Sequence, residues 1–200
     1  MADNSKYSTD YKLLAGLQSG DREAYKLLVE KYHVKVIRTC TGFVHSAADA
    51  EDIAQEVFIE VFRSVDRFRG DSALSTWIYR IAVNKSLNFL RSAARRKVFS
   101  FLTGHDDRNS TASIQEPASQ ESNPEEALMR GDQARTLEKA LASLPGKQRT
   151  AFVLNKYEDL AYKEISEIMD ISIGSVESLI FRAKQNLQKR LYDFYNKNMR

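Results

Sequence analysis

The chain has 200 residues, of which 42% are hydrophobic and 28% are charged, and its formal net charge is +3 at pH 7. This composition is typical of one or two soluble helical or mixed domains that fold without a metal or a disulfide. The single cysteine excludes an intramolecular disulfide, and no apolar run reaches the roughly 20 residues that a membrane-spanning helix needs. With a polar N-terminal segment that has no signal-peptide core, the sequence predicts a cytoplasmic protein.

A first helical domain is predicted over residues 10–97, where apolar residues recur at helical spacing and proline is absent. One helix in it has a clear apolar stripe, and its remaining faces carry the acidic residues of the acidic block 47–62. The stripe consists of Ile53, Val57, Phe58, Val61, Phe62 and Val65. Cys40 falls in another apolar helical run, where a buried thiol is the expected state. This domain is therefore expected to be an all-α bundle with one acidic outer face.

After a loop at residues 66–73, a further helix is predicted to run to Arg96, and it interleaves basic, amide and aromatic side chains. Cations can follow a phosphate backbone while aromatic faces stack on unpaired bases, so this mixture favours single-stranded or melting DNA over intact duplex. An alternative reading places Trp77 and Phe89 in the core and leaves the arginines as a solvated face.

A linker is predicted over residues 98–122, which are rich in Ser, Thr, Asn, Gln, Gly and Pro, with six acidic residues and one basic residue between 105 and 126. Asn123, Pro124 and the two glutamates after them then form a helix-start signal. A second helical domain is therefore expected over residues 123–195. Basic blocks on both sides of the acidic linker suggest two contacts with one polyanion.

The second domain contains a helix-turn-helix pattern, with a helix over 161–170, a turn over 171–174 and a second helix after it. In the second helix Val176, Ile180, Ala183 and Leu187 form the inward stripe. Ser175, Glu177, Ser178, Phe181 and Arg182 then face outward, as groove-reading side chains do, with Lys184 following. The alternative is an ordinary helical hairpin, although the basic residues after it suit DNA phosphates.

Enzyme chemistry has weak support in this sequence. The acidic cluster at 49–52 could in principle bind Mg²⁺ or act as acid and base, but neither a GxxxxGK nor a GxGxxG loop occurs. His33, His45 and His105 are not spaced with cysteines or carboxylates as metal ligands are. We therefore expect no catalytic residues, no metal, no cofactor and no small-molecule substrate. A stand-alone helix-turn-helix regulator with an N-terminal sensor domain is the second alternative.

Three segments resemble one known family, the extracytoplasmic-function (ECF) sigma factors of bacterial RNA polymerase, which belong to the sigma-70 family and include the sigma-24-like members. The segments are DAEDIAQEVF at residues 49–58, FRGDSALSTWIYRIAVN at 68–84, and the stretch from Leu144-Pro145 through Ala183-Lys184. They occur in the order and spacing of the family's two domains. The resemblance implies an all-α fold made of sigma region 2 and sigma region 4, joined by a flexible acidic linker.

The resemblance also implies roles for individual residues. Core polymerase would be bound by Asp49, Asp52, Gln55 and Glu56 on the acidic helix. The −10 element would be melted and held by Phe68, Trp77, Tyr79, Arg80, Asn84, Lys85, Asn88 and Arg91. The −35 element would be read by Ser175, Glu177, Ser178, Phe181, Arg182 and Lys184. The implied partners are core RNA polymerase, promoter DNA and an anti-sigma factor, which in this family is commonly membrane-linked.

The sequence departs from the family pattern at two places. Glu177 and Leu179 stand where the recognition helix commonly has basic residues, which changes the expected −35 preference. Trp77 is followed by Ile78, where the housekeeping sigma factors have a second tryptophan, so weaker melting is expected. For Glu177 two readings stay open: the carboxylate accepts from a cytosine N4 amino group, or it stabilises the N-terminus of its own helix.

Overall fold

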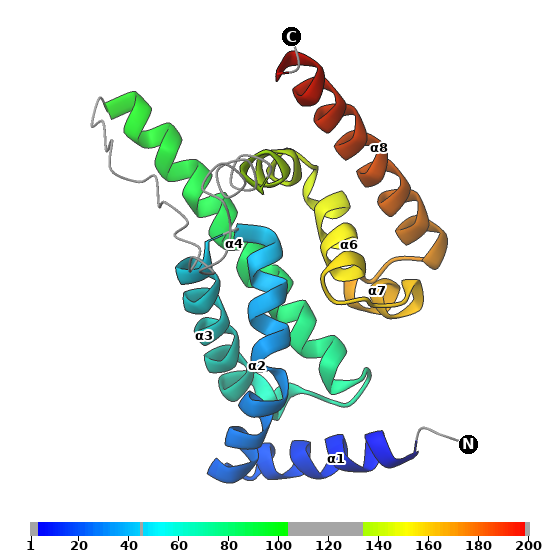
Figure 1. Cartoon of the computed structure of the whole chain (residues 1–200). Helices are drawn as coiled ribbons and strands as arrows, with labels where there is room; N and C mark the ends of the chain where they lie inside the picture. The colour runs from blue at the N-terminus through cyan, green and yellow to red at the C-terminus, as the bar shows by residue number, and fades with distance from the viewer. Residues whose placement is uncertain (1–3, 45, 104–133, 199–200) are drawn as a thin grey trace, which may run out of the picture.

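A computed structural model of the chain describes residues 4–44, 46–103 and 134–198. Within these ranges the regular secondary structure is entirely helical, which confirms the predicted all-α class. The helices form two bundles that pack side by side (Figure 1). Residues 104–122 of the predicted linker and the helix-start signal at 123–126 lie outside the described residues.

The first bundle contains α1 (Asn4–Gln18), α2 (Arg22–Val44), α3 (Ala47–Ser64), the short 3-10 helix η1 (Val65–Arg67) and α4 (Leu74–Thr103). Helices α2, α3 and α4 lie along one another, and α1 runs across one end of them (Figure 1). Their shared core is built from aliphatic side chains such as Leu28, Val36, Val57 and Ile78, all almost fully buried. Cys40 is buried in this core as expected, and burial raises the pKa of its thiol to about 11.

Helix α3 begins at a conventional cap, because the Ser46 hydroxyl accepts a hydrogen bond of 3.3 Å from the Asp49 amide. Five members of its predicted apolar stripe are buried: Ile53, Val57, Phe58, Val61 and Val65. Phe62 is an error of the prediction, since its side chain is 57% exposed. At 100° per residue Phe62 lies at the edge of the stripe, where its ring meets that of Tyr25 edge-on, with the ring centroids 5.4 Å apart.

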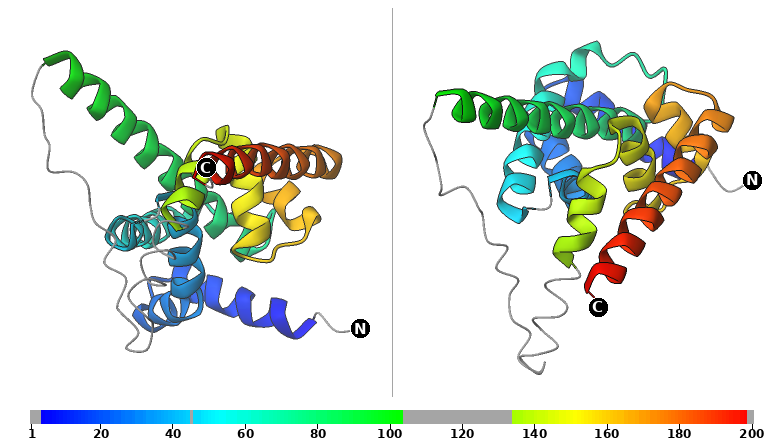
Figure 2. Two further views of the ribbon diagram at one scale, coloured as in Figure 1. Left: turned by 45° about the horizontal axis from the view of Figure 1, so that its top comes forward. Right: turned by 90° about the horizontal axis from the view of Figure 1, so that it is seen from above.

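Helix α4 differs from the prediction at its C-terminal end. It continues through Thr103, past residue 98 where the linker is predicted to begin. No glycine or proline occurs between Leu74 and Gly104, so the chain can remain helical there at a small cost in free energy. Figures 1 and 2 show this end of α4 projecting away from the other helices of the bundle, and Val98 and Phe99 on it are exposed.

The second bundle contains a helix over residues 134–142, followed by α6 (Gly146–Lys156), α7 (Tyr162–Met169) and α8 (Ile173–Asn198). All four residues of the predicted inward stripe of α8 are buried: Val176, Ile180, Ala183 and Leu187. They pack on α6, on α7, on the helix over 134–142 and on the turn after it, which together supply Leu141, Leu144, Leu154 and Ile165. The predicted helix-turn-helix pattern thus corresponds to α7, a short turn and α8.

The two bundles share part of their core, which the sequence analysis did not predict. Phe43 of α2 and Tyr79 and Val83 of α4 belong to the same buried cluster as the apolar residues of α6, α7 and α8. Gly42 lies against α6 so closely that a Cβ at this position would be 2.6 Å from Cγ1 of Val153. The two bundles therefore form one packed unit in this structure (Figures 1 and 2).

Candidate nucleic-acid and polymerase interface

The outward face of the second helix of the helix-turn-helix is open to solvent. Its predicted groove-reading residues, namely Ser175, Glu177, Ser178, Phe181, Arg182 and Lys184, are all exposed. Phe181 is 60% exposed although it is a large aromatic residue, and Ile173 at the helix start is 50% exposed. Large apolar side chains left in water on the first turns of the second helix of a helix-turn-helix are suited to contact base edges and thymine methyl groups.

The turn before α8 holds this face in a defined orientation. Asp170 ends α7 in the left-handed region, with φ of 53°, and the Ile171 amide donates to the Ser166 carbonyl at 3.1 Å. The Ser172 hydroxyl then accepts from the Ser175 amide at 3.2 Å, as an N-cap residue does. At the start of α7 the Glu164 carboxylate accepts from the Ala161 amide at 2.8 Å. These contacts fix the angle between the two helices.

The cap on α8 bears on the two readings of Glu177. Helix α8 begins at Ile173, and its first turn contains no acidic residue. Glu177 lies in the second turn, whereas the stabilisation of a carboxylate by the helix dipole falls off within the first turn. Because Ser172 already occupies the cap and Glu177 is exposed, the structure argues against the helix-stabilising reading.

The predicted melting helix α4 presents part of its basic and amide face. Asn84, Asn88 and Arg91 are exposed, and Arg91 donates to the Asn88 side-chain oxygen at 3.2 Å. Trp77 is half-buried and packs against Phe68, with ring centroids 4.9 Å apart and planes 32° apart. Both rings also contact the core of the first bundle. The structure therefore combines the two readings of Trp77, which is partly a core residue and partly available at the surface.

Two residues predicted to act at the −10 element contact the second bundle. Tyr79 is only 5% exposed, and its hydroxyl donates to the Glu158 carboxylate at 3.0 Å. Burial is the largest cause that raises the pKa of this phenol, followed by the nearby carboxylate. The Nε of Arg80 donates to the Glu167 carbonyl of α7 at 3.2 Å. In this arrangement Tyr79 is closed to DNA, and Arg80 is held by the helix-turn-helix.

Lys85 connects the two predicted surfaces of the first bundle. Its ammonium lies 3.5 Å from a carboxylate oxygen of Glu56 and 3.5 Å from one of Glu60, both on α3. Glu56 is two-thirds exposed, so this pair contributes little to stability and is free to exchange for other partners. Asp52, Gln55 and Glu56 remain exposed along α3, and Asp49 is half-buried at its start.

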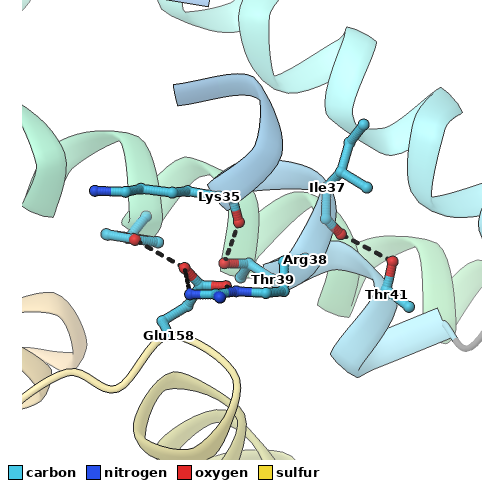
Figure 3. A network of polar contacts seen from close by, with 7 residues as sticks. Lys35, Ile37, Arg38, Thr39, Thr41 and Glu158 are labelled. Carbon is cyan, nitrogen blue, oxygen red and sulfur yellow. Dashed lines mark hydrogen bonds and ion pairs between the residues drawn. The ribbon is translucent and has the colours of Figure 1, made fainter. Parts of the chain in front are cut away.

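Sequence reasoning missed the polar residues between the bundles. Arg38 of α2 and Glu158, in the turn after α6, form an ion pair 120 positions apart in the chain (Figure 3), and no local pattern signals such a pair. Arg149 of α6 is also buried, and it donates to the Phe43 carbonyl of α2. Burial lowers the pKa of its guanidinium to about 10. The sequence contains one signal that could have revealed this contact: Arg149 is a charged residue at an inward position of α6.

Two absences characterise the described part of the chain. None of its His, Cys, Asp and Glu residues gather in groups of three or more that could hold a metal ion. None of its helices combines the length and the apolar character needed to cross a membrane.

Comparison with known sequences identifies both bundles. The family model described as sigma-70 region 2 matches residues 28–96, and the one described as sigma-70, region 4 matches residues 134–187. An RNA polymerase sigma-H factor of Pseudomonas aeruginosa is 38% identical over 184 residues, which covers 91% of this chain and 93% of that protein. An ECF RNA polymerase sigma-E factor of Escherichia coli K12 is 37% identical over 189 residues, covering 94% and 96% respectively.

Solved structures of similar fold agree with this match. CnrH, in a complex with the cytosolic domain of CnrY, superposes with a TM-score of 0.65 at 21% identity and covers 92% of this chain and 97% of that one. The sigma factor RpoE of Bartonella quintana, in a complex with the anti-sigma factor NepR, has a TM-score of 0.59 at 22% identity and covers 84% and 96%. The chain therefore belongs to the sigma-70 family, as an ECF sigma factor that directs RNA polymerase to promoters and initiates transcription there.

Proposed function

We propose that the two bundles divide promoter recognition between them, with α4 acting on the −10 element and α8 reading the −35 element. The observation that carries this proposal is the exposed face of α8, where a polar and basic surface with one unburied phenylalanine extends from a capped helix start. Ser175, Glu177 and Ser178 would lie nearest the base edges, and Phe181, Arg182 and Lys184 would follow along the groove.

In the first bundle, we assign contacts with the DNA strand of the −10 element to the exposed residues of α4. Asn84, Asn88 and Arg91 are available there without any rearrangement. Lys85 would exchange its ion pairs with α3 for DNA phosphates, and Phe68 with Trp77 would support an unstacked base. Tyr79 and Arg80 would join this surface only when the second bundle moves away.

The acidic face of α3 is the proposed site for core polymerase. Asp52, Gln55 and Glu56 are exposed on it, and Asp49 extends the face to the capped start of the helix. A rigid helix with a row of exposed carboxylates suits a basic partner surface, because complementary potentials steer association and fix register. The chain would then act by binding alone, in the cytoplasm, without catalytic residues of its own.

An anti-sigma factor is a further proposed partner. A groove of about 1030 Å³ runs between α4 and the second bundle, and its apolar lining includes Val83, Leu87, Leu90, Leu144 and Ile168. An amphipathic helix of an inhibitor would bury its apolar face well in such a groove.

The test of the proposed function is run-off transcription with core polymerase on genomic fragments. The chain should direct initiation from a discrete set of fragments, and those fragments should share a −35 and a −10 sequence. A gel shift without polymerase provides the contrast: specific duplex binding by the free chain, without transcription in the first assay, would indicate a stand-alone regulator instead.

A further inference from the structure

The N-terminal helix α1 contacts the connection between α3 and α4 through one polar side chain. Gln18 is the last residue of α1, and its Nε2 donates to the Phe68 carbonyl at 3.3 Å and to the Val65 carbonyl at 3.4 Å. Both acceptors are carbonyl oxygens, so the contact requires a donor at the end of the side chain. Figure 1 shows this connection at the same end of the bundle as α1. Gln18 therefore ties the N-terminal helix to the start of the loop before α4.

The side chain of Gln18 starts from a well-anchored helix end. Gly20 adopts a left-handed φ of 76° in the turn after α1, and its amide donates to the Leu17 carbonyl at 3.1 Å. Leu13 and Leu17 are both buried in the core of the first bundle. The position of the Gln18 amide is thus set by the packing of the whole helix.

The loop that Gln18 reaches has few other restraints. In the described part of the chain, residues 69–72 form hydrogen bonds and ion pairs only with one another and with Ala73. At the far end of the loop, the Ala73 carbonyl accepts from the Trp77 amide of α4 at 3.1 Å. At the near end, Gln18 binds the carbonyl of Phe68. The loop is therefore held at its two ends.

Phe68 connects this anchor to Trp77. Its carbonyl is bound by Gln18, and its ring packs against that of Trp77 with the centroids 4.9 Å apart. Both rings are half-buried against the core of the first bundle. A shift of the backbone at Phe68 would therefore move the ring pair of Phe68 and Trp77, on which an unstacked base would rest.

We propose that Gln18 is a positioning residue for the −10 element, which fixes the backbone at Phe68 and thereby holds the ring pair ready for an unstacked base. This inference rests on the proposed role of α4 and the ring pair at that element. A ring pair that is already ordered binds at a smaller entropic cost than one that must be ordered on binding. Helix α1 precedes the segment 28–96 that matches the region 2 family model, and it takes part in promoter opening through this contact.

Three variants of the full chain separate the hydrogen bonds from packing and charge. Gln18→Met keeps a side chain of similar length but has no donor, whereas Gln18→Lys supplies three N–H donors. The double variant Gln18→Met/Tyr11→Lys is the matched control, because it carries the same added charge as Gln18→Lys without a donor at position 18. Tyr11 is 75% exposed and lies seven residues before Gln18, about 10 Å away along α1.

Trp77 is the single tryptophan of the chain, so its fluorescence reports directly on the ring pair. Quenching by acrylamide, a neutral quencher, measures the access of solvent to this ring. We expect Gln18→Met and the double variant to raise the quenching constant about twofold, since losing neutral hydrogen bonds shifts a local equilibrium by a small factor. Gln18→Lys should stay near the wild-type value, and thermal unfolding of all variants should be similar.

Run-off transcription with core polymerase supplies the functional measurement, on linear duplex and on a template with a pre-melted −10 bubble. Transcription from duplex should fall about fivefold in the two variants without a donor, while transcription from the bubble template is retained. Gln18→Lys should support both. This difference between templates separates positioning from a general weakening of the chain, which would lower transcription from both templates alike.

Four results would overturn the positioning role of Gln18. They are unchanged quenching in Gln18→Met, equally raised quenching in Gln18→Lys, raised quenching with normal transcription from duplex, and equal losses on the two templates. Failure of the wild-type chain to transcribe from either template would count instead against the proposed function.

Discussion

Glu177 is the residue at which the recognition helix departs most from the family pattern, and its position suggests a direct contact with DNA. The carboxylate is exposed in the second turn of α8, beyond the cap formed by Ser172. A carboxylate near phosphates is repelled unless it accepts a hydrogen bond from a base. In the major groove the cytosine N4 amino group is the donor that suits it.

We therefore predict that Glu177→Gln relaxes the requirement for one base pair of the −35 element. Transcription is measured from promoters varied singly at each −35 position, with the wild-type chain and the variant. Discrimination of about 1–3 kcal/mol should be lost at one position and kept at the others. A uniform change, or none, would show that Glu177 does not read a base.

Trp77 is predicted to act in DNA opening. Stacking contributes about 1–3 kcal/mol per base, so Trp77→Ala should reduce permanganate reactivity of the −10 region on linear duplex. Because Trp77 also packs on Phe68 and on the core, thermal unfolding of the variant must be recorded alongside. Restored transcription on a template with a pre-melted bubble would confirm the opening role, and equal footprints of variant and wild type would refute it.

At the scale of the element, α3 is an amphipathic helix with one face packed in the core and one face exposed, and the exposed face is the proposed site for core polymerase. Its buried face carries Val57 and Val61 in the core, and its exposed face carries Gln55 and Glu56. Changes on the exposed face should therefore affect binding without affecting the fold. This separation permits a sharp test.

We predict that Gln55→Ala combined with Glu56→Arg abolishes binding to core polymerase, while the free energy of unfolding changes by less than about 0.5 kcal/mol per substitution. Competition against the wild-type chain for core polymerase measures the first quantity, and chemical denaturation measures the second. Glu51→Ala, also on an exposed position of α3, serves as a control for the helix surface. Equal competition by the double variant would remove α3 from the binding site.

The elements also show which features a sequence can reveal. The apolar periodicity of α3 and α8 predicted their buried faces, because burial on one side of a helix leaves a repeat of 3.6 residues. The end of α4 was set too early, since polar composition after residue 98 does not by itself end a helix. The exposed face of α8, proposed to read the −35 element, was predicted as the complement of the apolar stripe of that helix.

The contact between the bundles could not be predicted in this way. Arg38 and Glu158 are ordinary charged residues in their local sequences, and their pairing depends on how two separate bundles dock. The sequence analysis placed Tyr79 on a DNA-binding face because its own helix gives no sign that it is buried. Its burial depends on contacts with the other bundle. Local patterns carry no information on either contact.

At the scale of the whole molecule, the shared core has a consequence for a chain cut between its two domains. Arg108 is the only arginine or lysine between residues 105 and 126, in a segment whose polar composition predicts an accessible linker. We predict that brief trypsin treatment cuts after Arg108 and that the two fragments stay together, because Phe43, Tyr79 and Val83 remain packed on the second bundle and Glu158 keeps its partners. Gel filtration of the cut chain should give one peak that contains both fragments.

The same treatment of Gly42→Ala should give two peaks, since the close approach to Val153 is lost. Two separate peaks from the cut wild-type chain would mean that the bundles do not hold each other without the linker.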